Sequence, residues 1–255
     1  MNLEATFTPA EFETLRQQDL SDAACVVFDV LRATSTIVTA LARGADSVLP
    51  VATIEEAMRS RASDTNVLLA GERNGLRITA ALAGGVDFDL GNSPREYSAA
   101  IVRGRRIVTT TTNGTRAFAA CRNARYVFAG AFLNLNQTAQ HLARLNCPRI
   151  ILVCAGTGEA VAFEDCLGVG ALCHRLLTLN PATAMSDSAS VTADMFKVHA
   201  DELEAAMQKS SNARRLLAIP ELSEDVAFCL SENLFPIVVG AESNGTLRRI
   251  GAEQI

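Results

Sequence analysis

One segment constrains the fold of this chain more than any other: residues 23–30 read AACVVFDV, an apolar run interrupted only by Asp29. Continuous apolar runs of this length are typical of a strand that is covered on both faces, as in a parallel sheet. Shorter runs of the same kind alternate with helical segments along the chain. This alternation predicts an α/β fold of three layers, α/β/α, around a mixed and largely parallel sheet.

The expected elements follow one another with short connections. Strands are expected at 23–30, 47–51, 67–70, 106–110, 126–129 and 149–154, and helices at 36–43, 54–61, 115–121, 136–145, 164–179, 188–210 with or without a break, and 212–217. Residues 236–240 and 246–250 indicate a closing hairpin around Ser243-Asn244-Gly245. Because no linker separates two compositions, we expect a single domain over residues 1–255.

Residues 28–57 and 108–139 share one order of features: a strand end, a polar turn, an alanine-rich helix, a strand and a helix. An internal duplication of a βαβα unit and a chance likeness between two such units explain this order equally well. If the duplication is real, two related loops would face one cleft.

Composition excludes several classes of protein. The net charge is −5 with both signs interspersed, so no basic surface for nucleic acid is expected. The N-terminus does not resemble a signal peptide, and no apolar stretch approaches the roughly 20 residues that a membrane span needs. The seven cysteines form no C-x-x-C pair and read as reduced core residues of a cytoplasmic protein.

Polar side chains follow nearly every expected strand, where open α/β sheets bind their ligands. They are Asp29, Arg32, Thr34 and Ser35 after the first strand; Glu72 and Arg73 after the third; Asn92, Ser93 and Arg95 in the next loop; Thr111, Thr112, Asn113 and Arg116 after the fourth; and Thr157, Glu164 and Asp165 after the sixth. Arginine binds phosphate, sulfonate or carboxylate, and carboxylates suit Mg²⁺. The set favours anion and metal chemistry of the kind that phosphoryl transfer needs.

Each residue alone has a structural explanation. Asp29, Thr34 and Ser35 are ordinary helix caps, and the carboxylates Glu164 and Asp165 suit the first turn of a helix. The chain has no P-loop, no G-x-S-x-G elbow and no zinc-type cluster. Only the combination of residues favours a catalytic site.

The segments FDVLRATSTIVTALARGA, LLAGERNGL, FDLGNSPREY, TTTNGTRA, VCAGTGEAVAFEDCLGVGAL and EDVAFCL occur in this order. Together they resemble the 2-phosphosulfolactate phosphatase family over almost the whole chain. The resemblance implies a three-layer α/β/α fold and Mg²⁺-dependent hydrolysis of (2R)-2-phospho-3-sulfolactate to 3-sulfolactate and phosphate, a phosphoric monoester hydrolase reaction. In methanogens this step belongs to coenzyme M biosynthesis.

The resemblance also assigns roles to matching positions. It places Asp29, Arg32, Glu72 and Asp165 in catalysis and Asp29, Glu72, Glu164 and Asp165 at the metal. It places Thr34, Ser35, Arg73, Asn92, Ser93, Arg95, Thr111, Thr112, Asn113, Arg116, Gly156 and Thr157 at the substrate. Two departures are a shift of one acidic residue to Glu159 and a longer stretch at 77–86, which would reshape the rim of the cleft.

Two routes of hydrolysis stay open at this point. Asp29 is either a metal ligand that positions a water or the nucleophile of an aspartyl-phosphate. Two other functions also stay open: a phosphatase for another small 2-phospho acid, and a non-catalytic protein that binds small anions. The expected partner is a small anionic phosphomonoester, with no nucleic acid and no membrane, and the oligomeric state is open, a homo-oligomer included.

Overall fold

The computed structural model describes residues 1–145 and 147–251, and within them a mixed sheet of eleven strands forms the centre. The strand order is β5-β4-β6-β3-β11-β10-β7-β2-β8-β1-β9. The strands are β1 (Asn2–Thr6), β2 (Ala23–Phe28), β3 (Ser47–Pro50), β4 (Leu68–Arg73), β5 (Leu76–Arg77), β6 (Arg106–Thr110), β7 (Tyr126–Gly130), β8 (Arg149–Cys154), β9 (Ala184–Met185), β10 (Val238–Ala241) and β11 (Leu247–Ile250).

The sheet consists of two parallel blocks. Strands β7, β2, β8, β1 and β9 run parallel in one block, and β3, β6 and β4 run parallel in the other. The predicted hairpin is confirmed as β10–β11, which lies between the blocks and runs antiparallel to β7 on one side and to β3 on the other. Three antiparallel steps therefore separate the blocks, and the two blocks run in opposite directions.

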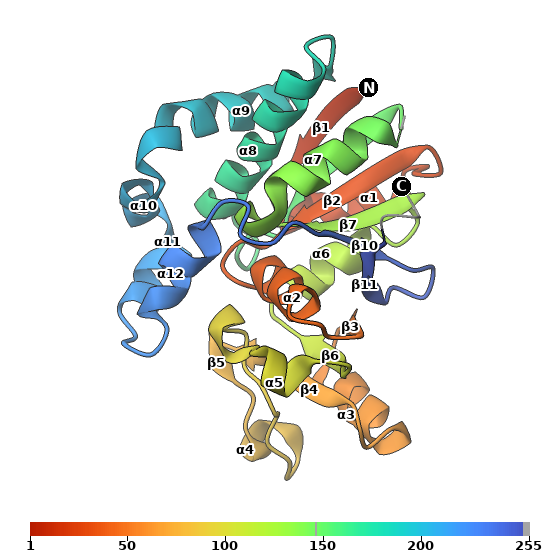
Figure 1. Ribbon diagram of the computed structural model, residues 1–255, viewed down its shortest axis with the longest axis vertical. Coiled ribbons are helices and arrows are strands. Elements are labelled where there is room, and N and C mark those ends of the chain that lie inside the picture. Colours follow the sequence, from red (N-terminus) through yellow and green to blue (C-terminus); the bar gives the residue numbers. More distant parts are fainter. Residues whose placement is uncertain (146, 252–255) are drawn as a thin grey trace.

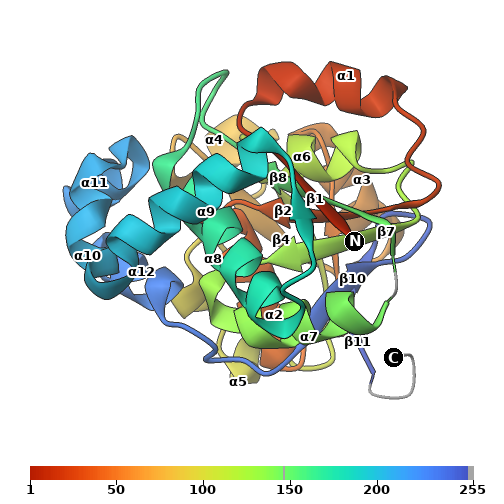
Figure 2. The ribbon, with the colours of Figure 1, turned by 90° about the horizontal axis from the view of Figure 1, so that it is seen from above.

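Helices cover both faces of the first block, which confirms the three-layer α/β/α prediction (Figures 1 and 2). In chain order the helices are α1 (Phe12–Gln17), α2 (Ala33–Ala42), α3 (Ile54–Ser63), α4 (Ala80–Ala83), α5 (Ala99–Val102), α6 (Gly114–Ala120), α7 (Leu135–Arg144), α8 (Phe163–Leu179), α9 (Asp187–His199), α10 (Leu203–Ala206), α11 (Ser211–Leu217) and α12 (Ser223–Leu230), and α3 packs against β4 and β6 of the second block. From β2, Val26 and Phe28 pack in a core with α7 and α8, whereas Cys25 and Val27 pack in a core with α1 and α6. The apolar run of β2 is thus buried on both faces, as its sequence predicts.

The helix expected at 188–210 is broken, into α9, α10 and short 3-10 turns. Sequence reasoning missed β1, α1 and α12. Strand β1 is short and alternates, with Leu3 and Ala5 buried and their neighbours half-buried, so it lacks the continuous apolar run used to recognise strands. Among the described residues no helix is both long and apolar enough to cross a membrane.

The two similar segments do share one order of elements, β2-α2-β3-α3 and β6-α6-β7-α7. The first strand of each unit pairs in parallel with the second strand of the other, β2 with β7 and β6 with β3. A common origin of the two units stays a prediction, as does the single domain.

Candidate active site

The carboxyl ends of both blocks meet at one place. Arg32, after β2, donates a hydrogen bond from Nη2 to the carbonyl oxygen of Gly75, after β4, at 2.7 Å. The amide of Gly158, after β8, donates to Oδ1 of Asn113, after β6, at 3.3 Å. Four strand ends from two oppositely directed blocks therefore converge on one region. In a simple parallel sheet, the four ends would instead lie side by side along a single edge.

The elements that follow β2 and β6 approach each other closely at Gly114, the first residue of α6. A Cβ atom at this position would lie 2.8 Å from Cβ of Ala33 and 2.9 Å from Oδ2 of Asp29. Both distances are shorter than ordinary van der Waals contact, so glycine is what allows α6 to begin directly against the start of α2. This contact brings the Asp29 carboxylate beside the loop that follows β6.

A cavity of about 500 Å³, its open mouth included, lies at this meeting point. The sequence-predicted residues that line it are Asp29, Arg32, Glu72, Asn92, Thr111, Thr112, Asn113 and Thr157. The other lining residues are Leu31, Asn74, Gly75, Gly158 and Arg215. The hydroxyl of Thr111 is buried without a hydrogen-bond partner among the described residues.

Asp29 is a buried carboxylate in the cavity wall. Its Oδ1 accepts a hydrogen bond from the amide of Ala33 at 3.1 Å, so the residue caps α2 and faces the cavity at once. Burial raises the pKa of Asp29 to about 6; the amides of Ala33 and Gly114 oppose this rise, and the charges of Glu72 and Glu164 add to it. A carboxyl group of this kind is largely ionised at neutral pH and repelled by its acidic neighbours, so it favours a bound cation.

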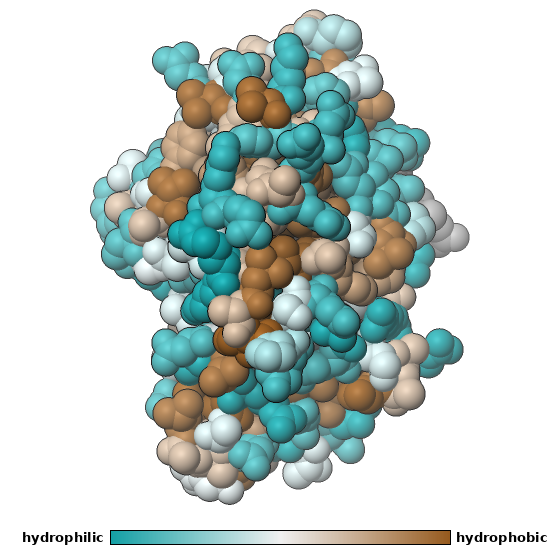
Figure 3. Space-filling model, turned by 90° about the vertical axis from the view of Figure 1, so that its left-hand side faces the viewer, coloured by the Kyte–Doolittle hydropathy of each residue, from teal (hydrophilic) through white to brown (hydrophobic). Residues whose placement is uncertain are grey.

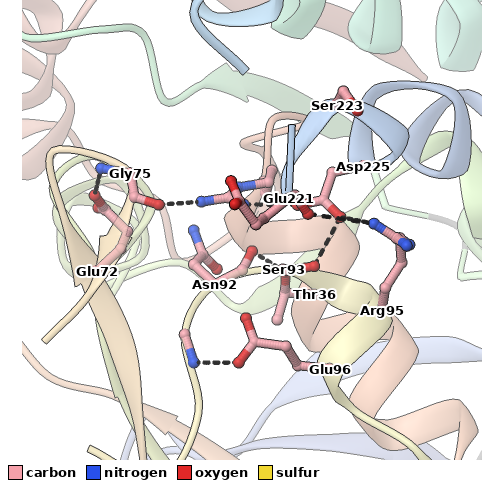
Figure 4. A network of polar contacts seen from close by, with 12 residues as sticks. Thr36, Glu72, Gly75, Asn92, Ser93, Arg95, Glu96, Glu221, Ser223 and Asp225 are labelled. Carbon is pink, nitrogen blue, oxygen red and sulfur yellow. Dashed lines mark hydrogen bonds and ion pairs between the residues drawn. The ribbon is translucent and has the colours of Figure 1, made fainter. Parts of the chain in front are cut away.

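Glu72 connects the two loops of the second block. Its Oε1 accepts hydrogen bonds from the amide and the hydroxyl of Thr112, at 2.8 and 2.9 Å. Its Oε2 accepts from the amide of Gly75 at 2.7 Å (Figure 4). The carbonyl oxygen of Gly75 also accepts a hydrogen bond from Arg32. One chain of hydrogen bonds therefore joins Arg32, Gly75, Glu72 and Thr112. The cationic and acidic sides of the cavity are therefore held in a fixed relation.

Arg32 is held from behind by α12. Its Nη1 lies 2.6 Å from Oδ2 of Asp225, and both side chains are almost completely buried. The other oxygen of Asp225 accepts a hydrogen bond from the hydroxyl of Ser93 at 2.7 Å (Figure 4). The guanidinium of Arg32 is thus already oriented where it reaches the cavity wall, and a fixed planar fork suits the binding of an anion.

The two remaining predicted metal ligands face the protein interior. Asp165 accepts hydrogen bonds from the amides of Val30, at 2.8 Å, and Gly156, at 3.0 Å. Burial, with the charges of Glu164 and Asp29, raises the pKa of Asp165 well above its usual range. Glu164 accepts hydrogen bonds from Ser210 and Asn212, both at 2.7 Å.

Neither Glu164 nor Asp165 lines the cavity. Within residues 1–145 and 147–251, no three histidines, cysteines or carboxylates gather as a metal cluster. Of the four predicted metal ligands, Asp29 and Glu72 therefore line the cavity.

Several predicted substrate-binding residues instead hold the loops together. The hydroxyls of Thr34 and Ser35, in the first turn of α2, donate to the carbonyls of Asp29 and Val30 at 3.0 and 2.9 Å, so both attach the helix to the end of β2 and neither is its N-cap, which is Arg32. Arg73 donates to the hydroxyl of Thr110 at 3.1 Å.

Four other predicted residues also lie outside the cavity wall: Ser93, Arg95, Arg116 and Gly156. Arg95 forms ion pairs with Glu224 and Asp225, and Arg116 pairs with Glu159 at 2.8 Å beside Gly158 at the cavity edge. The acidic residue that departs from the family pattern thus neutralises an arginine at the rim of the cavity.

Sequence reasoning missed Arg215, Asn212 and the buried role of Asp225. Arg215 and Asn212 lie on α11, in a helical segment that follows no strand, so a search of strand ends passes over them. A usable signal for Asp225 was its position directly before the apolar stretch VAFCL, since a charge that is buried with such a stretch requires a partner.

Comparisons with known proteins identify the family. A family model described as 2-phosphosulpholactate phosphatase matches residues 10–244. A probable 2-phosphosulfolactate phosphatase of Thermotoga petrophila is 41% identical over 213 residues, 84% of this chain and 86% of that protein. Proteins with the same name are 37% identical in Caldanaerobacter subterraneus subsp. tengcongensis, over 93% of this chain and 95% of the relative, and 39% identical in Deinococcus radiodurans, over 84% and 87%.

Proposed function

Because this chain belongs to the 2-phosphosulpholactate phosphatase family, we propose that it hydrolyses 2-phospho-3-sulfolactate to 3-sulfolactate and phosphate, with Mg²⁺ as cofactor. The observation that carries the proposal is one cavity lined by a buried arginine, Arg32, and two buried carboxylates, Asp29 and Glu72. Positive charge for the phosphate and acidic groups for a cation are the two requirements of phosphate ester hydrolysis.

The residues present fit Mg²⁺. This ion usually takes one or two protein carboxylates and completes its shell with water and substrate phosphate oxygens. Asp29 and Glu72 provide that number, and their repulsion, which contributes to the raised pKa of Asp29, would be relieved by a cation. When bound, Mg²⁺ would neutralise charge on the phosphate oxygens and lower the pKa of a coordinated water.

The chain's own groups have separate roles. Arg32, fixed by Asp225 and by the carbonyl of Gly75, binds a non-bridging phosphate oxygen without having to reorganise. Asp29 contacts the reacting phosphate from the side of α2, where the amide of Ala33 fixes its carboxylate. In the hydrolysis an oxygen of water ends on phosphorus, the ester P–O bond breaks, and the leaving oxygen of sulfolactate takes up a proton.

Asp29 serves this reaction in one of two ways. If it positions water, hydrolysis in ¹⁸O-water places the label in phosphate and none in Asp29. If it attacks phosphorus, the ester P–O bond breaks as an acyl phosphate forms on Asp29, and water then attacks that phosphorus, so that phosphate carries the label and Asp29 regains its own oxygen. Phosphate trapped on Asp29 in a rapid acid quench, followed by mass spectrometry of the peptide, distinguishes the two routes.

Phosphate release from a panel of small phosphomonoesters tests the proposed function. The panel contains 2-phospho-3-sulfolactate, 2-phospholactate and 2-phosphoglycerate, each with EDTA and with added Mg²⁺. We expect the highest kcat/KM for phosphosulfolactate, and no turnover in EDTA. Asp29→Asn should abolish release, whereas Asp194→Asn, a carboxylate of α9 outside the cavity, should not change it.

Preference for another 2-phospho acid would replace the proposed substrate by that compound. No release from any phosphoester, with binding of sulfolactate retained, would instead show a protein that binds small anions without catalysis. Full activity in EDTA would contradict the role proposed for Mg²⁺.

A further inference from the structure

A second arginine lines the same cavity, on a helix that follows no strand. Arg215 projects from α11, and among the described residues it forms no ion pair. Its Nη2 donates a hydrogen bond to Oδ1 of Asn212 at 3.2 Å. Arg32, in contrast, is engaged by Asp225 and by Gly75. Arg215 is therefore the lining arginine whose charge is not already balanced by a carboxylate.

The position of Arg215 is fixed by a set of contacts beneath it. Asn212 donates through Nδ2 to Oε1 of Glu164, at 2.7 Å, and to Oγ1 of Thr157, at 2.6 Å. Ser210 donates to the other oxygen of Glu164 at 2.7 Å. Glu164 thus has a structural role, because it attaches the start of α11 to α8, and Asn212 transmits that attachment to Arg215.

Arg215 faces the turn between β4 and β5. A Cβ atom built on Gly75 would lie 3.8 Å from Cζ of Arg215, so the guanidinium lies against the backbone of this turn. Helix α11 lies above β5 on the same side of the molecule (Figure 1), and that side is mostly hydrophilic with a narrow apolar band between its upper and lower parts (Figure 3). Arg215 thus occupies the solvent side of the cavity, and Asp29 its buried side.

The charges of the cavity are therefore arranged along one direction. The buried end carries the acidic groups Asp29 and Glu72 with Arg32, and these suit a phosphate with a cation. The acidic groups would repel any further anion of the substrate that came near them. The outer end offers an exposed arginine without an acidic partner, where a carboxylate or sulfonate gains a charge-assisted hydrogen bond.

We infer that Arg215 binds the second anionic group of the substrate, a carboxylate or sulfonate, and so selects phosphomonoesters that carry such a group. This inference rests on the proposed function, because it assumes that a phosphate occupies the buried end. Arg215 is a specificity-determining residue in this arrangement. The planar fork of its guanidinium matches two oxygens of either group.

Substrate discrimination tests the inference in Arg215→Ala and Arg215→Lys. We compare kcat/KM for 2-phospho-3-sulfolactate with kcat/KM for isopropyl phosphate, which has no second anion. The ratio should fall about 10- to 100-fold in Arg215→Ala, mainly through KM of phosphosulfolactate, since one charge-assisted interaction is lost. The ratio for Arg215→Lys should lie between those of the wild type and Arg215→Ala, because lysine keeps the charge and loses the planar fork.

The neighbouring Arg214→Ala is the matched control. Arg214 is also exposed on α11, but its Nη1 donates to the carbonyl of Gln208 at 2.6 Å and it does not line the cavity. Its removal causes the same loss of charge and should leave the ratio unchanged. An unchanged ratio in Arg215→Ala, or an equal fall in Arg214→Ala, would overturn the inference.

Calorimetric titration with 3-sulfolactate separates this inference from the proposed function. If the wild type releases no phosphate from phosphosulfolactate, the proposed function fails, and binding still decides the role of Arg215. Weaker binding to Arg215→Ala than to Arg214→Ala supports the inference. Equal binding to the two variants, or no binding to the wild type, overturns it.

Discussion

Asp225 and Arg32 form an ion pair of 2.6 Å between side chains that are 0% and 2% exposed, although 193 residues separate them in the chain. The pair attaches α12 to the loop after β2. A buried pair of this kind contributes little net stability, but loss of one partner leaves the other charge uncompensated. The orientation of the arginine at the phosphate end therefore depends on a helix from the far end of the chain.

Replacing Asp225 should damage both stability and activity. Asp225→Ala leaves the buried Arg32 without its partner, so we expect a loss of about 3–5 kcal/mol in the free energy of unfolding. Asp225→Asn keeps the shape and one acceptor, so it should fold better while still lowering kcat/KM. Urea unfolding, compared at an unchanged m-value, measures the loss of stability. Steady-state kinetics measures the loss of kcat/KM.

Glu224→Gln is the control for this change. Glu224 precedes Asp225 on α12, but its side chain is 73% exposed and pairs with the partly exposed Arg95. Surface pairs contribute little, so a change below about 0.5 kcal/mol is expected. Equal effects of Asp225→Ala and Glu224→Gln would show that burial of the Arg32 pair does not matter.

The sequence predicts much of this fold because the fold depends on local patterns. The apolar run of β2 and the turn before β11 are readable without knowledge of the rest of the chain. The opposite directions of the two parallel blocks are not readable, because they follow from where β10–β11 inserts. Strand β1 was missed because its burial depends on pairing with β8, far along the chain, where Asn2 lies opposite Arg149.

The candidate site also contains features that the local sequence predicts and features that depend on distant parts of the fold. Asp29 and Arg32 follow β2, and Glu72 lies at the end of β4, so a search of strand ends found them. That search also included Asp165, which follows β8 as well but turns its carboxylate to the amides of Val30 and Gly156. Which way a side chain turns depends on donors elsewhere in the fold, so residue type and position alone do not decide it.

The pKa of Asp29 predicts how the metal-free protein responds to pH. Its folded-state pKa of about 6 is above the usual 3.8, so the folded state binds this proton more tightly than the unfolded state does. The contribution to stability is complete below about pH 4 and is lost as pH rises to about 6, up to about 3 kcal/mol.

Unfolding free energies measured in EDTA from pH 4 to 7 test this effect. The difference between wild type and Asp29→Asn should change over that window, because the variant lacks the titrating group. Added Mg²⁺ should stabilise the wild type above pH 6, where Asp29 is ionised, and should do so much less in the variant. A pH-independent difference would contradict the raised pKa.

The cysteines should be unreactive in the native protein. All seven are buried, and burial raises the pKa of the Cys173 and Cys229 thiols to about 12, so almost no thiolate is present at neutral pH. A thiol reagent such as Ellman's should therefore modify all seven only after unfolding in guanidinium. Rapid reaction of even one thiol in the native protein would show that its surroundings open readily.

The close approach of α6 to α2 predicts a sensitive position at Gly114. Gly114→Ala inserts a methyl group 2.8 Å from Cβ of Ala33 and 2.9 Å from Oδ2 of Asp29, so α6 must retreat or the Asp29 carboxylate must move. We expect a loss of about 1–3 kcal/mol in stability, typical of overpacking, and a larger relative loss in kcat.

Ala33→Gly removes one of the two clashing atoms, so the double variant should regain stability more than activity, because the contact with Asp29 remains. Chemical unfolding and kinetics of the four proteins in this double-mutant cycle measure the coupling. Wild-type kcat in Gly114→Ala would mean that the position of Asp29 relative to α6 is not important for the reaction.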